Sequence, residues 1–232
     1  MTPREQSLDP EPERLAWLAL LPAFMTALYY ALPPRLQNQP SVLFLPQVLS
    51  YIGLAIWAGQ NSAILERLGL QRHQLGQGLR WGLLTGLLLG LLNVSVILWL
   101  VPSLGGDISF LRETPHARFP AVVMLPWAIL IIAIAVEVNF RGFLLGRLHA
   151  LGQHSWGAHY PLVGSVLAVG GASTAFAFDP FMVATFKHLH WIALWDGIIW
   201  GAIWVRLRNL YATIVAHAVE VMIMYSILKL VL

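Results

Sequence analysis

The stretch WGLLTGLLLGLLNVSVILWLV, residues 81–101, decides the fold class of this chain. It contains no charged residue, and as a helix it is long enough to cross a bilayer core, which takes about 20 apolar residues. Similar windows recur along the chain, near 15–32, 42–64, 81–101, 119–138, 161–178, 187–205 and 210–231. The sequence therefore predicts an all-α, polytopic membrane bundle of about seven transmembrane helices, within a range of about six to eight.

The composition of the whole chain agrees with a membrane environment. Of the 232 residues, 58% are hydrophobic and 11% are charged, and the mean hydropathy is +0.69. Soluble domains carry about 25% charged residues, so this chain has too few charges to cover a water-facing surface. It has no cysteine, which excludes a disulfide scaffold, a thiolate zinc site and a cysteine nucleophile. The Lys and Arg residues are scattered singly, so we expect a lipid bilayer and no nucleic acid as partner.

The sequence predicts one membrane domain preceded by a short tail. Residues 1–14 are polar and proline-bearing and are interpreted as an N-terminal tail, followed by a single transmembrane domain over 15–232. With seven spans and the tail inside, nine of the 14 Lys and Arg residues fall on the inner side. Because basic residues favour the cytoplasmic side, we predict a multi-pass protein of the cell membrane with a cytoplasmic N-terminus.

Small residues at a spacing of four indicate close helix packing. Gly78, Gly82, Gly86 and Gly90 form one such stripe, and the pairs Gly142/Gly146 and Gly197/Gly201 repeat the spacing. In membranes, such stripes let two helix backbones approach closely. They are interpreted as packing seams without catalytic meaning.

Polar groups at membrane depth are the candidates for function, because each is costly in lipid. They are Asn93, Glu137, Asn139, Arg141, Asp179, His188, His190, Asp196, His217 and Glu220. Histidines outside these spans, such as His73 and His116, are interpreted as interfacial residues.

The densest polar cluster is AIAVEVNFRGFLLGRL, residues 133–148, where Glu137 and Arg141 are four apart and share a helix face. One hypothesis makes them a structural ion pair. The other makes Glu137 a general base that holds a water against a substrate carbonyl, with Arg141 supporting it.

Two further clusters contain histidine. His217 and Glu220 are three apart on one face of an apolar helix, which favours a site over an isolated structural histidine. In FKHLH, residues 186–190, Phe186 and His190 share a face, although a basic interfacial loop explains that pattern too.

These motifs and the segments around them resemble the motifs of a known protein family. VEVNFRGFLLGRL, residues 136–148, is similar to the first motif of the CAAX protease and bacteriocin-processing (CPBP, or Abi) family, which has two glutamates, two variable residues and Phe-Arg-Gly. The segment GIIWGAIWVRLRNLYATIVAHAVEV, residues 197–221, resembles the closing segment of that family, and ASTAFAF, residues 172–178, resembles the lead-in to its Phe-x-x-x-His motif. The likeness covers roughly residues 66–225.

The chain departs from the family pattern at three places. Val136 stands where the family has its first glutamate, so Glu137 is the remaining carboxylate. Spacing from Phe176 puts the family histidine on Pro180, with His190 as a shifted alternative. The closing His-x-x-x-Asn becomes His217 to Val221, with Glu220 beside the lost asparagine.

The resemblance implies an intramembrane endopeptidase that cleaves a membrane-associated peptide or protein by a glutamate-activated water. It implies Glu137, His217 and His190 as catalytic residues, with Arg141, Glu220 and Phe186 in support and no metal or cofactor. Three alternatives stay open. They are an inactive relative that binds a partner membrane protein, for immunity or assembly, a metal site made by Glu137, His190, His217 and Glu220, and an ion path.

Overall fold

The computed structural model describes residues 13–37, 39–156 and 160–232, and these residues are almost entirely helical, with no strand among them. The predicted all-α class is therefore confirmed. Helices satisfy their own backbone hydrogen bonds, which an apolar solvent requires. Of the predicted tail 1–14, residues 1–12 lie outside the described residues.

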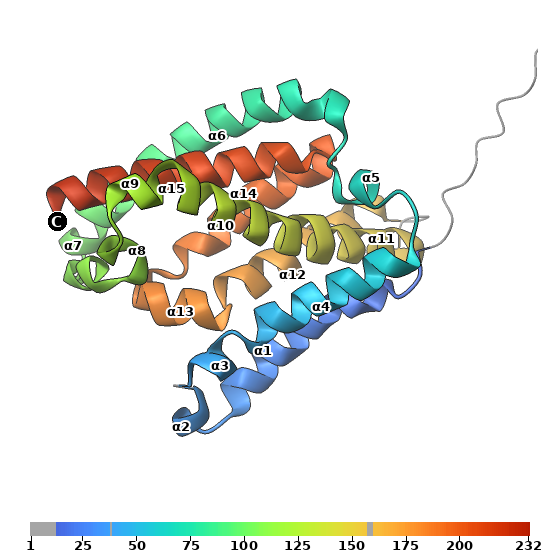
Figure 1. Cartoon of the computed structure of the whole chain (residues 1–232), viewed down its shortest axis with the longest axis horizontal. Helices are drawn as coiled ribbons and strands as arrows, with labels where there is room; N and C mark the ends of the chain where they lie inside the picture. Colours follow the sequence, from blue (N-terminus) through green and yellow to red (C-terminus); the bar gives the residue numbers. More distant parts are fainter. Residues whose placement is uncertain (1–12, 38, 157–159) are drawn as a thin grey trace, which may run out of the picture.

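The first helices form an arm on one side of the molecule. A short helical segment, η1 (Ala16–Leu20), continues into α1 (Leu21–Ala31), which runs beside α4 (Leu45–Gln60) (Figure 1). Two short helices, α2 (Pro34–Gln37) and α3 (Pro40–Leu43), join them at the tip of the arm. Gly53 of α4 contacts the carbonyl of Leu18, so the two helices meet closely at the other end.

A glycine seam joins α6 to α15. After α5 (Ile64–Leu68) and the turn η2 (Arg72–Gln74), helix α6 (Leu75–Ser95) packs along α15 (Leu210–Val231) (Figure 1). A Cβ built on Gly82 would lie 2.5 Å from the Cβ of Val215, and one built on Gly86 would lie 2.6 Å from the carbonyl of Ala216. The predicted packing role of this stripe is confirmed.

The connection that follows α6 caps one end of the bundle. It consists of η3 (Val96–Leu100), α7 (Val101–Ser103), η4 (Ser109–Glu113), α8 (Pro115–Arg118) and α9 (Ala121–Val123). Lys229, in the last turn of α15, donates hydrogen bonds to the carbonyls of Ala117 and Phe119 and so ties α8 to the C-terminal helix.

A long helical rod runs through the centre. It comprises η5 (Met124–Ala128), α10 (Ile129–Glu137), the π-helical segment η6 (Val138–Leu145) and α11 (Gly146–Trp156). The η6 segment is buried throughout most of its length, and Ser50 of α4 donates a hydrogen bond to Asn139 there. The chemistry-bearing motif at 133–148 thus lies in the core of the bundle.

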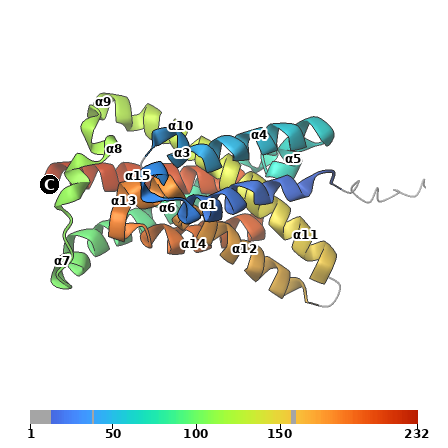
Figure 2. The same ribbon diagram turned by 90° about the horizontal axis from the view of Figure 1, so that it is seen from below.

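Helices α12 (Pro161–Ala177) and α14 (Ile192–Leu207) pack against this rod, and they are seen with α15 in Figure 2. Between them lie α13 (Pro180–Phe186) and the turn η7 (Lys187–Leu189). Gly197 and Gly201 of α14 face Ser173 and Val169 of α12, as the second glycine pair predicts.

Three described helical segments are long and apolar enough to cross a membrane: Ile64–Ser103, Ala121–Gln153 and Leu210–Val231. A fourth span results if Leu162–Ala177 and Pro180–Leu189, which are bent by 54°, are counted as one. The segment Ala16–Ala31 is apolar but shorter. A membrane protein with three or four such spans is therefore supported, and the count of seven stays a prediction.

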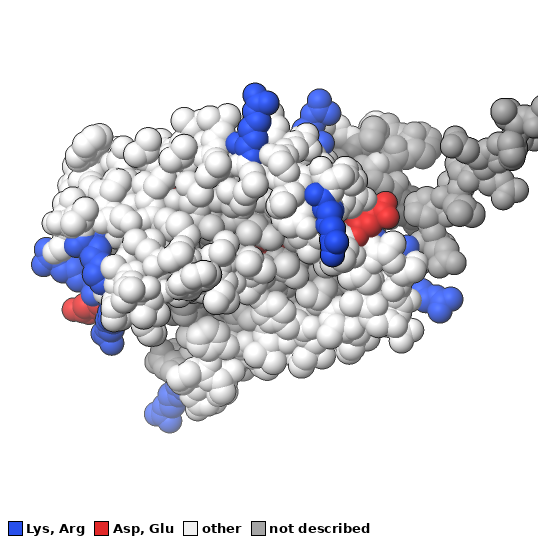
Figure 3. Space-filling model, turned by 45° about the horizontal axis from the view of Figure 1, so that its top comes forward, with Lys and Arg blue, Asp and Glu red and all other residues white. Residues whose placement is uncertain are grey.

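The surface and the chain ends fit a spanning protein. On the face shown in Figure 3, charged side chains cluster at one end and are spread over the opposite half, with an uncharged area between the two groups. The described chain begins at one end of the molecule and the C-terminus lies at the opposite end (Figure 1).

Candidate functional site

A cavity of about 530 Å³ lies inside the bundle, between the rod, the α13 region and the helices α14 and α15. Most of its wall is apolar, and it reaches the outer surface at Phe44 and Ile132. Polar side chains interrupt the wall at a few places, including His116, His190, Asp196, His217 and Glu220. An apolar cavity with a few convergent polar groups is the usual form of a ligand site.

Glu137 lies behind this wall and not in it. Its side chain has 0% exposure, and Val136 is the residue of α10 that lines the cavity at this level. Oε1 of Glu137 accepts from Nη1 of Arg141 at 3.0 Å and from Nδ1 of His217 at 2.9 Å. The other oxygen, Oε2, is buried without a hydrogen-bond partner among the described residues. Glu137 is therefore engaged by Arg141, by His217 and by the nearby side chain of Thr213, and it does not line the cavity.

Arg141 is held between aromatic rings. Its guanidinium carbon lies 4.5 Å from the ring centre of Phe176 and 4.8 Å from that of Trp200. Cation–π contacts of this kind stabilise a desolvated guanidinium. The i, i+4 spacing of the sequence is thus realised as a buried ion pair inside an aromatic cage.

His217 connects this pair to the cavity. Its ring stacks on Trp200 at 4.7 Å between centres and lines the cavity. An ionised Glu137 only accepts hydrogen bonds, so Nδ1 of His217 carries the proton. Nε2 is then the ring nitrogen left for a ligand, and Glu137 acts on the cavity by fixing the orientation of His217.

A second polar cluster joins three helices one turn further along α15. Nδ2 of Asn93, on α6, donates to both oxygens of Asp196 at 3.1 Å and to Oε1 of Glu220 at 2.7 Å. Nε1 of Trp195 donates to the Asn93 carbonyl oxygen at 3.0 Å. Asp196 and Glu220 both line the cavity. The acidic residues that line the cavity are therefore Asp179, Asp196 and Glu220, and Glu137 is not among them.

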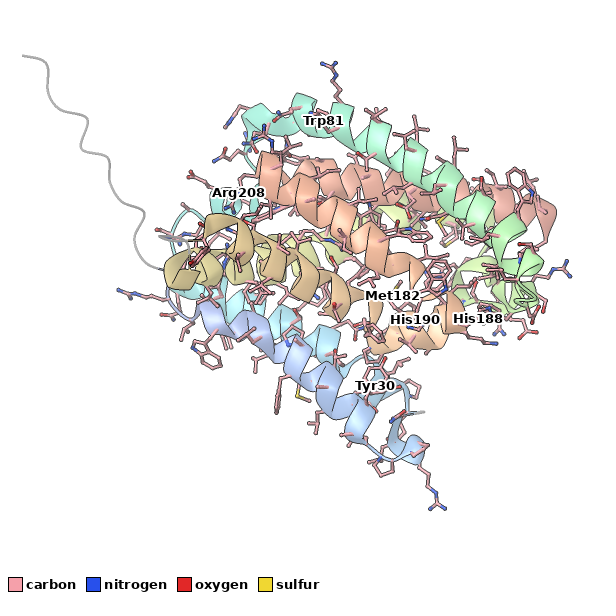
Figure 4. The ribbon with its side chains drawn as sticks, turned by 180° about the vertical axis from the view of Figure 1, so that it is seen from behind. Tyr30, Trp81, Met182, His188, His190 and Arg208 are labelled. Carbon is pink, nitrogen blue, oxygen red and sulfur yellow. The ribbon has the colours of Figure 1, made fainter. Side chains whose placement is uncertain are left out.

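His190 and Phe186 both line the cavity, but from different segments. Phe186 ends α13, and His190 follows η7, where its Nδ1 lies 2.6 Å from the carbonyl of Lys187. Figure 4 shows His190 close to Met182, another cavity residue, whereas His188 lies further along and packs on Phe110. The structure thus brings His190 and His217 to one cavity.

The positions that depart from the family pattern have structural roles here. Asp179 caps α13 by accepting from the backbone N–H groups of Phe181 and Met182, and Pro180 occupies the first turn of that helix. Val221 lines the cavity where an asparagine would stand. None of the three places offers a histidine or an amide to the cavity.

Sequence reasoning missed two cavity residues. Asp196 was recognised as polar but given no role, and His116 was interpreted as interfacial. His116 lines the cavity from α8, and its ring stacks on Phe186 at 6.2 Å. Burial, with a smaller contribution from nearby His217, lowers the pKa of His116 below its usual value. An acid alone in the apolar stretch WIALWDGIIW was the available signal for Asp196; nothing in the sequence singled out His116.

The metal alternative lacks its ligand set. Among the described residues, no group of three or more His, Asp or Glu side chains is placed to hold a metal ion. The proposed four-residue site fails because Glu137 is turned toward Arg141 and away from the cavity that holds His190 and Glu220.

These features define a membrane-embedded helical protein with a buried acid–arginine–histidine cluster beside an apolar cavity. Residues 118–223 match the family model described as type II CAAX prenyl endopeptidase Rce1-like. The match confirms the resemblance to the CAAX protease and bacteriocin-processing family over just under half of the chain, which includes all three clusters. No curated protein matches the chain. No solved structure matches it either.

Proposed function

We propose that this Rce1-like membrane protein binds the apolar end of a membrane-associated polypeptide in its cavity, and that it does so without hydrolysis by Glu137. One observation carries the proposal: Val136 lines the cavity, while Glu137 lies behind the wall with Oε1 shared by Arg141 and His217.

The cavity supports the binding half of this proposal. Its volume of about 530 Å³ lies within the range of small-ligand sites, roughly 300–1,000 Å³. Ile132 is 39% exposed on the outside of α10 and also lines the cavity, so an apolar chain can enter from the side of the bundle. The family model describes a prenyl endopeptidase, which makes a polypeptide with an apolar end the fitting class of ligand.

The chemistry supports the second half. A general base must reach its proton directly or through one water. A carbonyl in the cavity meets Val136 and His217, and His217 stands between it and Glu137. The positions that spacing gives for the family's histidine and asparagine hold Pro180 and Val221, so neither of these two places supplies an oxyanion-stabilising group.

Hydrolysis by Glu137 is the competing function, and the direct contact of Glu137 with His217 at 2.9 Å favours it. A base paired with a cavity histidine is the arrangement that water activation needs. In that function, a shift of Val136 or His217 would have to open a water path to Glu137.

Binding and cleavage are separated by one experiment on purified protein in nanodiscs. A fluorescent apolar peptide is titrated against wild type and against Val136→Trp, and the recovered peptide is analysed by mass spectrometry. We expect wild type to bind the peptide and return it intact, and Val136→Trp to lose binding at least about tenfold, because the indole projects into the cavity and takes up space that the peptide needs. Val122→Trp, on the exposed surface, is the matched control and should bind normally.

Two results would overturn the proposal. Equal binding by wild type and Val136→Trp would place the ligand outside the cavity. A cleaved peptide, with cleavage lost in Glu137→Gln, would establish the competing hydrolase.

A further inference from the structure

We propose that the outer half of the N-terminal arm is a gate, which swings away from α13 to let the apolar end of the polypeptide enter the cavity from the lipid. The outer half comprises α1, α2, α3 and the first turn of α4. This inference rests on the proposed binding function and deepens it, because it names the route by which the ligand reaches the cavity. The family resemblance covers roughly residues 66–225 and does not include the arm.

The two halves of the arm differ in how firmly they are held. In the inner half, Trp57 and Ser50 of α4 are completely buried, and the ring of Trp57 packs on Phe143 of the rod. In the outer half, Tyr30 and Phe44 are 42% and 43% exposed, and Figure 1 shows this half diverging from the bundle. A segment with few buried apolar contacts opens at a low free-energy cost. The inner half can therefore serve as the pivot of the outer half.

Two hydrogen bonds join the outer half to the bend between α12 and α13. The hydroxyl of Tyr30 donates to the carbonyl of Phe178 at 2.9 Å, and Figure 4 shows Tyr30 on the side of the arm toward Met182 of α13. Nε2 of Gln47 donates to Oδ1 of Asp179 at 2.6 Å, while Oε1 of Gln47 is buried with no donor among the described residues. Asp179 keeps its two backbone donors when Gln47 leaves, so opening does not strand the carboxylate. Because hydrogen bonds between membrane helices contribute only modestly, both can open.

The outer half of the arm also borders the mouth of the cavity. Phe44 and Ile132 line the cavity and are exposed on the outside, so the mouth lies between the arm and the rod. The ring of Phe44 lies against that of Phe181, with 5.2 Å between their centres, and covers the side of the mouth toward α13. Movement of the arm takes this ring away and widens the mouth toward the lipid.

The contact between the arm and the bundle is not closely packed. A void of about 10 Å³, room for about one water, lies between Pro22, Thr26 and Pro46 of the arm and Asn139 and Ala175 of the bundle. Atoms that line a void lack the dispersion contacts of a packed interior. The arm therefore separates from the bundle most easily along this line.

A reversible crosslink across the gate tests the proposal, because the chain has no cysteine of its own. Tyr30→Cys/Phe178→Cys is joined in nanodiscs by a short, reducible bis-thiosulfonate linker. Tyr30 and Phe178 are exposed and do not line the cavity, so the linker holds the gate without filling the cavity. We expect the fluorescent apolar peptide to associate at least about tenfold more slowly with the linked than with the unlinked variant, and a reductant to restore the rate.

Phe24→Cys/Leu28→Cys is the matched control. These exposed residues are one turn apart on α1, so a linker between them does not hold the arm to α13. The linker should leave the association rate of this variant unchanged. Tyr30→Phe is a second test without any linker, because it removes only the hydroxyl that bonds Phe178. It should speed association and release together by about threefold, as the loss of one neutral hydrogen bond would give.

A gate slows exit as well as entry. When the peptide is bound before the linker is added, we expect release at least about tenfold slower than from the unlinked variant. Slow association without slower release overturns the gate, because the linker would then have distorted the cavity.

The remaining outcomes separate the two proposals. Equal association rates for linked and unlinked protein, or for wild type and Tyr30→Phe, overturn the gate and leave the binding function standing. If neither wild type nor the unlinked variant binds the peptide, the proposed binding function itself fails.

Discussion

Glu137 is the residue on which the proposed function depends most. Its i, i+4 spacing to Arg141 predicts a contact on one helix face, and the 3.0 Å ion pair has that geometry. Val136 lines the cavity and Oε1 of Glu137 contacts Nδ1 of His217, so in the proposed binding function the carboxylate orients His217 and does not meet the ligand. In that function, Glu137 and Arg141 hold His217 in position in the cavity wall.

Arg141 gives the first prediction at this scale. Arg141→Ala leaves Glu137 buried without its cation and empties the space between Phe176 and Trp200. Breaking a buried pair costs about 3–5 kcal/mol. We expect a clearly lower thermal midpoint in detergent, measured by the loss of helical circular dichroism.

Arg80→Ala is the control for this prediction, because Arg80 is exposed on α6. Arg147 would be a poor control, since it is 2% exposed and pairs with Glu13 at 2.5 Å. Equal midpoints for Arg141→Ala and Arg80→Ala would show that the buried pair contributes nothing to stability.

The sequence predicts local partners better than distant ones. Glu137 and Arg141 are one turn apart, so helical periodicity alone puts them together. Glu137 and His217 are separated by 80 positions, and Asn93 and Glu220 by 127, so their contacts depend on how the helices pack. That packing decides that Asp196 and His116 enter the cavity wall while Glu137 does not.

At the scale of elements, the α6–α15 seam places the second cluster. Close approach along Gly78, Gly82, Gly86 and Gly90 brings Asn93 of α6 within hydrogen-bonding distance of Glu220 on α15. The four-residue spacing predicts such a seam, but it does not predict which helix is the partner. The site thus depends on a packing feature several turns away.

Gly82→Val tests this dependence. A Cβ at Gly82 would lie 2.7 Å from the backbone carbonyl of Ala212, which has little freedom to move. Overpacking of this kind typically costs about 1–3 kcal/mol. We expect a lower thermal midpoint together with weaker peptide binding, because α6 is pushed away from α15, which lines the cavity.

Gly76→Val, on the same helix, has no atom within 4 Å of its built Cβ and is the matched control. If Gly82→Val and Gly76→Val melt at the same temperature and bind equally, the seam does not position the site.

The bend between α12 and α13 is an element that spacing could not resolve. The windows 161–178 and 187–205 leave residues 179–186 between them unassigned. Asp179 caps the new helix and Pro180 begins it, so the chain turns by 54° and places α13 against the cavity. Local capping chemistry thus replaces the histidine that the family pattern puts at this place.

For the whole molecule, the distribution of charge bears on orientation. Arg208, labelled in Figure 4, lies at the end where the described chain begins, and Arg67, Arg72 and Arg80 lie at or near the same end. Arg141 does not belong to this set, because it is buried in the core and cannot act as a loop charge. The remaining excess of basic residues still favours a cytoplasmic location for this end.

Single cysteines test this orientation cleanly, because the chain has none of its own. His73 is exposed in η2, and Glu113 is exposed in η4 near the opposite end. We expect an impermeant maleimide added to intact cells to label Glu113→Cys and not His73→Cys. The reverse labelling pattern would place the N-terminal end outside.

The central claim is that a polypeptide occupies the cavity and remains intact, and photo-crosslinking tests it most directly. p-Benzoylphenylalanine is introduced at Phe186 in the cavity wall, and at Phe24, 65% exposed on the outer surface, as a control. After irradiation with the apolar peptide, we expect the Phe186 variant to carry the peptide at its full mass, and the Phe24 variant to carry little. A truncated peptide on the Phe186 variant, or equal crosslinking at both positions, would contradict the account.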